Sequence, residues 1–226
     1  MRHYELVIFD WDGTLMDSVG KIVDCMQQSA LTLNMPMPTE QAVRDIIGLS
    51  MDEALTILHP NGSAELQADM KEVYRQQYLE LNQTPSPLFD GVEDLLTTLN
   101  GLGYKLAVAT GKARAGLNRV LTATELGRYF VASRCADEAA SKPSPEMILQ
   151  LLKELDISPD KAVMIGDSIH DLNMANNAGI HAIGVDYGAH DQNKLSQANP
   201  KAVISSPMEL LKHLSTKQFY LQRDNL

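Results

Sequence analysis

The sequence predicts an α/β protein with a mostly parallel sheet, helices on both faces of that sheet, and an inserted all-helical region. Three observations predict this class. A short apolar run near the N-terminus, residues 6–9, is typical of a strand buried on both faces. In the second half of the chain, helical apolar stripes alternate with further short apolar runs. Between these two regions, residues 18–81 have helical periodicity almost throughout.

The composition is that of a soluble globular protein. The chain has 226 residues, enough for one large α/β domain or for a core of about 150 residues plus a smaller insert. No apolar segment approaches the ~18 residues that a membrane span needs. Because the chain enters a strand almost at once, we expect no signal peptide and a cytoplasmic location. The two distant cysteines, Cys25 and Cys135, suit a reducing compartment and suggest neither a disulfide nor a zinc site.

The formal net charge of -10 argues against nucleic acid as the main partner. The same charge does not exclude a small anionic substrate, because a bound metal and a few local cations can reverse the potential inside one cleft. We therefore expect a small-molecule partner, with no nucleic acid and no membrane, and a monomer or a homodimer.

The strand at Leu6 to Phe9 runs directly into two acids separated by one residue, Asp10 and Asp12. Since side chains alternate along a strand, both carboxylates can lean to the same side of the strand end, and Gly13 allows the backbone to turn away. Two carboxylates in one small space repel each other unless a cation or a shared proton relieves the repulsion. The pair therefore indicates a divalent metal, acid/base chemistry, or both.

The region that follows is expected to be helical. Its apolar residues recur at helical spacing from Val19 to Leu33, and Ser50 with Glu53 forms a capping box that opens a further helix. Pro85 and a second proline two residues later mark a linker. We therefore expect a core domain of residues 1–16 and 85–226, and a helical cap domain of residues 17–84 placed over the end of the first strand.

From residue 90 onward the pattern is that of βα units. Apolar helical stripes are expected at 92–102 and 147–155, and a helix is expected to end at Gly179. Strands are expected at 105–110, 162–167, 180–185 and 202–204. Ser206 to Glu209 reads as a capping box with proline at the first helical position, which opens the last helix.

Polar residues stand at three of these strand ends: Asp10, Thr110 and Asp167. Strands alternating with helices imply right-handed crossovers and a parallel, Rossmann-like sheet, in which such residues meet along one edge. Between the second and the third lies Lys142, followed by two prolines that fix the backbone before a helix starts.

Four ordered motifs resemble those of the haloacid dehalogenase superfamily. They are Asp10-Trp11-Asp12-Gly13-Thr14-Leu15, Thr110-Gly111-Lys112, Lys142-Pro143-x-Pro145-Glu146 and Gly166-Asp167-Ser168-x-x-Asp171. Each motif alone is weak or moderate, but all four in this order are highly specific. A helical cap between the first and second motifs resembles the phosphoglycolate phosphatase-like branch.

The resemblance implies a magnesium-dependent phosphatase that works through an aspartyl-phosphate. Asp10 would be the nucleophile, and Asp12 the general acid and base. Asp10, Asp167 and the backbone carbonyl of Asp12 would bind Mg²⁺, and Asp171 would hold a metal-bound water or Lys142. The Thr110 hydroxyl, the amide of Gly111 and Lys142 would bind the phosphate group. The favoured substrate is 2-phosphoglycolate.

The cap contributes weaker candidates. Arg44, Gly48 and Ser50 lie at a helix junction that can reach the substrate and set specificity. Gly48 also fits a residue that ends a helix, and Ser50 one that caps the start of the next helix. Lys112 and Arg114 are expected to be solvated helix residues.

Other functions stay open from the sequence. The same site would suit a sugar phosphate, a nucleotide monophosphate, pyrophosphate, or an intramolecular phosphomutase reaction. Dehalogenation is disfavoured because it has no leaving alcohol for Asp12 to protonate. Phosphonate hydrolysis is disfavoured because it requires a cap lysine that forms a Schiff base, and Lys21, the only early cap candidate, has ordinary surroundings. A non-catalytic phospho-accepting signalling module is a remote alternative, since its acceptor would lie at a later strand end.

Overall fold

The computed structural model describes residues 3–214, and it contains one six-stranded parallel sheet in the order β3-β2-β1-β4-β5-β6. The C-terminal stretch 215–226, for which the sequence predicts no structure, lies outside the described residues. The predicted α/β class with a parallel, Rossmann-like sheet is confirmed. The strands are β1 Leu6–Phe9, β2 Lys105–Ala109, β3 Ala132–Arg134, β4 Ala162–Gly166, β5 His181–Val185 and β6 Ala202–Ile204.

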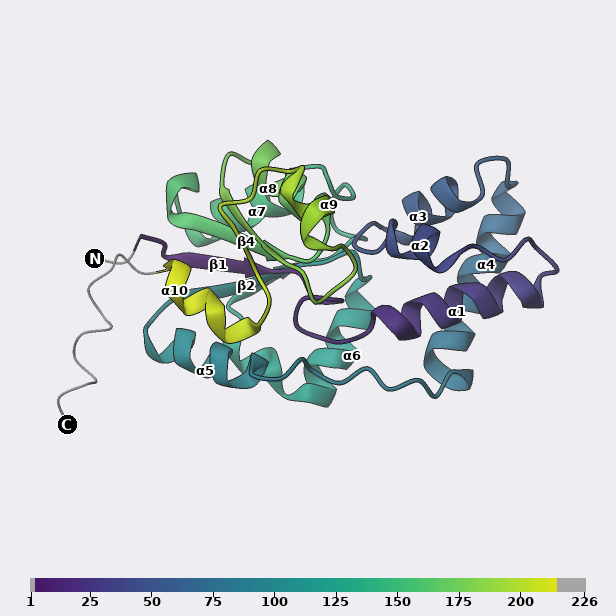
Figure 1. Cartoon of the computed structure of the whole chain (residues 1–226), viewed down its shortest axis with the longest axis horizontal. Coiled ribbons are helices and arrows are strands. Elements are labelled where there is room, and N and C mark those ends of the chain that lie inside the picture. The colour runs from purple at the N-terminus through teal and green to yellow at the C-terminus, as the bar shows by residue number, and fades with distance from the viewer. Residues whose placement is uncertain (1–2, 215–226) are drawn as a thin grey trace.

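Helices cover both faces of the sheet (Figure 1). Alternate residues of β1 enter separate apolar clusters: Val7 and Phe9 join one, and Leu6 and Ile8 join the other. The first cluster includes residues of α5 Val92–Gly101, α6 Arg114–Thr124 and α10 Leu211–Leu214. The second includes residues of α7 Glu146–Leu155, α8 Ile169–Asn177 and α9 Gln192–Ser196. This burial on both faces explains why the central strands carry almost no polar side chains.

A separate group of helices lies beyond the carboxyl end of β1, at one end of the molecule (Figure 1). It comprises α1 Val19–Thr32, α2 Glu40–Arg44, α3 Met51–Leu58, α4 Ala64–Gln76 and the π-helical turn η1 Gln77–Leu81. These helices bury an apolar cluster of their own, which includes Val23, Met26, Val43, Leu55 and Met70. We call residues 17–84 the helical cap, and its limits as an independent domain stay a proposal.

The two connections between the cap and the sheet lie side by side. Met16 forms an antiparallel bridge with Leu88, and the amide of Asp17 donates to the carbonyl of Pro87 at 2.8 Å. The amide of Phe89 donates to the carbonyl of Leu15 at 3.1 Å. The chain therefore enters and leaves the cap through one pair of adjacent extended segments.

The structure differs from the sequence-based expectations at some local points. Strand β3 has no counterpart among the predicted strands, because its residues are only half-buried and show no apolar run. The last helix begins as a 3-10 turn, η4 Pro207–Leu210, and the Ser206 hydroxyl donates to the Glu209 carboxylate at 3.2 Å instead of capping a backbone amide. At Ser50 only half of the predicted capping box forms, because the Ser50 hydroxyl accepts from the amide of Glu53 without a reciprocal bond.

The remaining short elements are the 3-10 turns η2 Leu126–Tyr129 and η3 Pro159–Lys161. Across residues 3–214, none of the helices has both the length and the apolar character needed to cross a membrane.

Candidate active site

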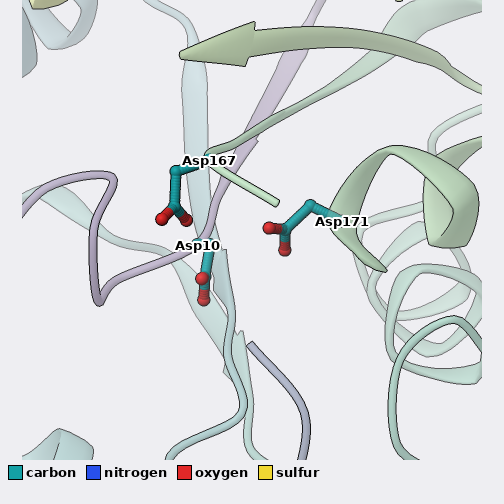
Figure 2. A group of neighbouring side chains, drawn as sticks. All are labelled: Asp10, Asp167 and Asp171. Carbon is teal, nitrogen blue, oxygen red and sulfur yellow. The ribbon is translucent and has the colours of Figure 1, made fainter. Parts of the chain in front are cut away.

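Three buried carboxylates meet at the carboxyl edge of the sheet. Asp10 follows β1, Asp167 follows β4, and Asp171 lies in the first turn of α8 (Figure 2). One oxygen from each lies within 4.8 Å of the others, and the three residues are at most 1% exposed. The first and fourth motifs therefore meet in space, as the sequence predicts.

The close approach of the two strand ends depends on Gly13. Its φ of +78° lies in the left-handed region, and a Cβ placed there would stand 2.0 Å from Oδ2 of Asp167. No side chain fits in that space, and a non-glycine residue would also be strained by the backbone conformation. Gly13 thus lets the loop after β1 lie directly against Asp167.

The structure fixes Asp167 and Asp171 through different partners. Asp167 accepts from the Thr14 hydroxyl at 3.2 Å and from the amide of Ala189 at 2.7 Å. Asp171 forms a full capping box with Ser168: its Oδ2 accepts from the Ser168 hydroxyl at 2.6 Å and from the Ser168 amide at 3.1 Å. Asp171 therefore caps α8 and belongs to the acidic cluster at the same time, because its hydrogen bonds to Ser168 set the direction of its side chain.

Lys142 is the cation of the cluster. Its fully buried ammonium lies 2.9 Å from Oδ1 of Asp10 and donates to Oδ1 of Asp171 at 2.6 Å. Although burial opposes its charge, the two carboxylates raise the pKa of Lys142 above its ordinary value. Removing one partner from such a buried pair typically costs about 3–5 kcal/mol, because the other charge is left uncompensated.

The three carboxylates carry more negative charge than Lys142 balances. Burial raises the pKa of Asp10 to about 7, and the neighbouring Asp171 and Asp12 contribute to this rise against the lowering effect of Lys142. Burial, Asp171 and Asp10 likewise raise the pKa of Asp167 well above its ordinary value. When all three are ionised, Lys142 leaves two negative charges uncompensated, which one divalent cation would balance.

The free oxygen atoms of the cluster fit a hard cation such as Mg²⁺. Among the described residues no donor makes a hydrogen bond to Oδ2 of Asp10, although this atom is buried. Both oxygens of Asp171, by contrast, already accept from Lys142 and Ser168. Asp10 is therefore better placed as a ligand than Asp171, and Asp171 contacts Lys142, one of the two partners expected for it. Each oxygen of Asp167 also accepts one hydrogen bond, and its role as a ligand stays a prediction. The role of the Asp12 carbonyl as a ligand stays a prediction.

Asp12 lies beside the cluster and is held separately. Its carboxylate accepts from the Ser18 hydroxyl at 2.6 Å and pairs with the Lys112 ammonium at 2.7 Å. The Lys112 side chain is only 11% exposed, and although burial opposes its charge, Asp12 raises its pKa. The expectation that Lys112 is a solvated helix residue is wrong, because it pairs with a buried carboxylate. Arg114 instead pairs with Glu138 at 2.6 Å, away from the acidic cluster and Asp12.

Thr110 and Gly111 lie at the end of β2, next to these acids. Thr110 is 1% exposed, and its hydroxyl accepts from the amide of Lys112 at 3.2 Å, which leaves its own proton free to donate. A Cβ at Gly111 would stand 2.5 Å from the carbonyl oxygen of Leu49. Glycine at this position therefore allows the cap loop at 48–49 to pass directly over the end of β2.

A cavity of about 360 Å³ opens between this edge of the sheet and the cap. Asp10, Asp12, Thr110 and Gly111 line it from the sheet, and Gly48 lines it from the cap. The remaining cap candidates do not line the cavity. Arg44 pairs with Glu40 at 2.8 Å and donates to the carbonyl of Gly188 at 3.3 Å, and the amide of Ser50 donates to the Ser141 hydroxyl at 2.9 Å.

Several residues that line the cavity were not predicted from the sequence, namely Tyr74, Tyr78 and Arg119. Tyr74 lies in α4 and Tyr78 in η1, far along the chain from the catalytic motifs. The available signal was their spacing of four residues, which places two aromatic rings on one helical face. That spacing alone does not reveal what the face covers.

Comparison with known proteins agrees with these motifs. Residues 7–185 match the family model described as haloacid dehalogenase-like hydrolase. The chain belongs to this family. The probable phosphatase IndB of Dickeya dadantii is 37% identical over 212 residues, covering 91% of each chain. A phosphoglycolate phosphatase of Vibrio vulnificus is 32% identical over 219 residues, covering 93% of this chain and 96% of the relative.

A solved structure also resembles this haloacid dehalogenase-like hydrolase along most of its length. The crystal structure of a hydrolase from Pseudomonas syringae matches with a TM-score of 0.85 and 27% identity, covering 93% of this chain and 97% of that chain. The similarity therefore includes the cap as well as the sheet, and all four motifs of this hydrolase lie inside the region that the family model matches.

We predict that Gly13→Ala removes most of the activity of this hydrolase. The added methyl group would collide with Asp167 and the backbone would be strained, so the acidic cluster would open. Hydrolase rate and melting temperature should both be measured. Gly20→Ala is the matched control, because a Cβ at Gly20, inside α1, meets nothing within 4 Å and alanine favours a helix by about 1 kcal/mol. Equal activity of Gly13→Ala and Gly20→Ala would contradict this account.

Proposed function

We propose that the protein is a magnesium-dependent phosphatase that hydrolyses a small phosphomonoester through an aspartyl-phosphate on Asp10. One observation carries the proposal: two carboxylates with different partners, Asp10 and Asp12, line the same cavity. Asp10 keeps a buried oxygen that no described donor contacts, as a nucleophile requires. Asp12 is held by a hydroxyl and an ammonium group, in a position to exchange protons.

In the first step, an oxygen of Asp10 attacks phosphorus while the bond from phosphorus to the leaving oxygen breaks. Asp12 donates a proton to that oxygen, so the product leaves as an alcohol. In the second step, Asp12 takes a proton from water, the resulting hydroxide attacks phosphorus, and inorganic phosphate leaves Asp10. One acid thus serves as donor and then as acceptor, and it ends in its starting state.

The remaining residues bind and orient the phosphate group. Thr110 offers a free hydroxyl proton, Gly111 offers a backbone amide, and the Lys142 ammonium lies 2.9 Å from the proposed nucleophile. Asp10, Asp167 and the carbonyl of Asp12 would hold Mg²⁺, which when bound supplies positive charge to the phosphate oxygens. Without positive charge from both sources, the acidic edge of the sheet would repel a dianionic substrate.

The names of the relatives make 2-phosphoglycolate the first substrate to assay, since several relatives that are 30–32% identical to this chain are named phosphoglycolate phosphatase. Release of inorganic phosphate from a panel of monoesters, with magnesium present, is the direct test. No release from any member of the panel would count against the proposed function.

We predict that Asp10→Asn abolishes phosphate release while the fold is kept. Asparagine matches the shape of aspartate, and Asp171 still pairs with Lys142, but an amide oxygen does not form a stable bond to phosphorus. Initial rates and melting temperature should be measured beside Asp94→Asn, which changes an exposed acid in the first turn of α5. An active Asp10→Asn variant would exclude Asp10 as the nucleophile.

We predict that removing divalent metal with a chelator stops phosphate release and that Mg²⁺ restores it. Because Mg²⁺ would relieve the repulsion among buried carboxylates of the folded state, it should also raise the melting temperature. This thermal shift should be lost in Asp167→Asn, which removes one proposed ligand. Full activity in the presence of the chelator, or an equal thermal shift in the variant, would contradict the assigned metal site.

A further inference from the structure

The cavity above the acids is larger and less polar than a two-carbon substrate requires. Its volume of about 360 Å³ corresponds to on the order of a dozen water molecules at ~30 Å³ each. It falls at the lower end of the range of ~300–1,000 Å³ that is usual for pockets holding drug-sized ligands. 2-Phosphoglycolate has almost no apolar surface, so most of the cavity wall would gain nothing from binding it.

The wall supplied by the cap is apolar. It includes Ile22, Met26, Ile46, Ile47, Leu49 and Met51. Among the described residues that line the cavity there is no Asn, Gln, Ser, His or Glu side chain, and the only acids are Asp10 and Asp12 at its floor. The polar lining side chains are Thr110, Tyr74, Tyr78, the two acids and four cations, so hydroxyl groups of a polyol that lie against the aliphatic residues would lose hydrogen bonds to water without replacing them. An apolar group would instead be stabilised by burial.

Two aromatic rings give this wall a flat surface. Tyr74 and Tyr78 stack with their ring centroids 5.9 Å apart and an interplanar angle of 29°. Both line the cavity, together with the small residues Ala115 and Gly116 on the facing side of α6. A planar ring bound beside them would add stacked or edge contacts with tyrosine to the gain from burial, although the ammonium groups of Lys21 and Lys112 already lie 5.1 Å and 5.0 Å from the Tyr78 ring centroid.

Arg119 places a cation at the outer part of the same cavity. It lies on α6 four residues beyond Ala115, about 6 Å farther along the helix. The other lining cations have acidic partners: Lys112 pairs with Asp12, Lys71 with Asp52, and Arg75 with Glu72. Within residues 3–214, Arg119 pairs with no acid; its guanidinium lies 6.0 Å from the ring centroid of Tyr78.

We infer that the substrate is a phosphomonoester whose organic part is an apolar ring carrying an acidic group at its far end. This inference rests on the proposed phosphatase function. The phosphate binds at Asp10, the ring lies against Tyr78 and the apolar cap wall, and the acidic group pairs with Arg119. The inference therefore departs from 2-phosphoglycolate as the preferred substrate.

The test compares phosphomonoesters that share a primary alkyl leaving group, so that differences in kcat/KM report how well the organic part is bound. The probes are ethyl phosphate, 2-phosphoglycolate, benzyl phosphate and 4-carboxybenzyl phosphate. With magnesium present, kcat/KM for benzyl phosphate should exceed that for ethyl phosphate and 2-phosphoglycolate by at least about tenfold. The carboxylate of 4-carboxybenzyl phosphate should raise kcat/KM further, and Arg119→Gln should remove that additional gain.

Gly116→Leu tests the position of the ring. A Cβ at Gly116 meets only the Cβ of Lys112, at 3.9 Å, so the larger side chain can enter the cavity without disturbing the helix. The ratio of kcat/KM for benzyl phosphate to that for ethyl phosphate should fall by about tenfold or more. Gly101→Leu is the matched control: it changes a helical glycine in α5 whose Cβ meets nothing within 4 Å, and the ratio should not change.

The possible outcomes separate this inference from the function on which it rests. Faster turnover of 2-phosphoglycolate than of the benzyl probes would overturn the inference and leave the phosphatase function intact. An unchanged benzyl to ethyl ratio in Gly116→Leu would also overturn it. Absence of phosphate release from every probe would overturn both. A preference for the carboxybenzyl probe that disappears in Arg119→Gln supports the inference.

Discussion

The buried contact of Lys142 with Asp10 and Asp171 is the interaction on which the site depends. It lies at the carboxyl edge of the sheet, where the ends of β1 and β4 and the start of α8 meet. One ammonium group balances one of three buried carboxylates and leaves two negative charges. That excess makes the fully ionised cluster unfavourable on its own, and a divalent cation would relieve it.

A second, self-contained charge pair lies next to this cluster. Because Lys112 pairs with Asp12, the proposed acid and base has a cation of its own, and Asp10 and Asp12 open into one cavity. The division gives two carboxylates, two residues apart in the sequence, different environments and therefore different tasks. The same cavity combines apolar and aromatic residues with the charged floor, so the proposed substrate would be bound at its phosphate through charge and at its organic group through burial.

Most of this floor could be predicted from the sequence, because its residues lie in short motifs at the ends of predicted strands. A parallel sheet brings Asp10, Thr110 and Asp167 to one edge, and the prolines after Lys142 mark its loop as ordered. The wall could not be predicted in this way. Whether Tyr78 or Arg119 faces the cavity depends on how the cap packs over the sheet, and neither residue lies in a motif. Strand β3 was missed for a related reason, since its partly exposed residues lack the apolar run that identifies a buried strand.

We propose that the acidic edge of the sheet binds a divalent metal because its three carboxylates carry more negative charge than Lys142 balances. Crystals grown with Mn²⁺ in place of Mg²⁺ test it most directly through anomalous scattering. We expect one strong peak in contact with carboxylate oxygens of Asp10 and Asp167, with Lys142 still paired to Asp171. An acidic cluster without a peak at saturating Mn²⁺, or a peak bound only elsewhere in the molecule, would contradict it.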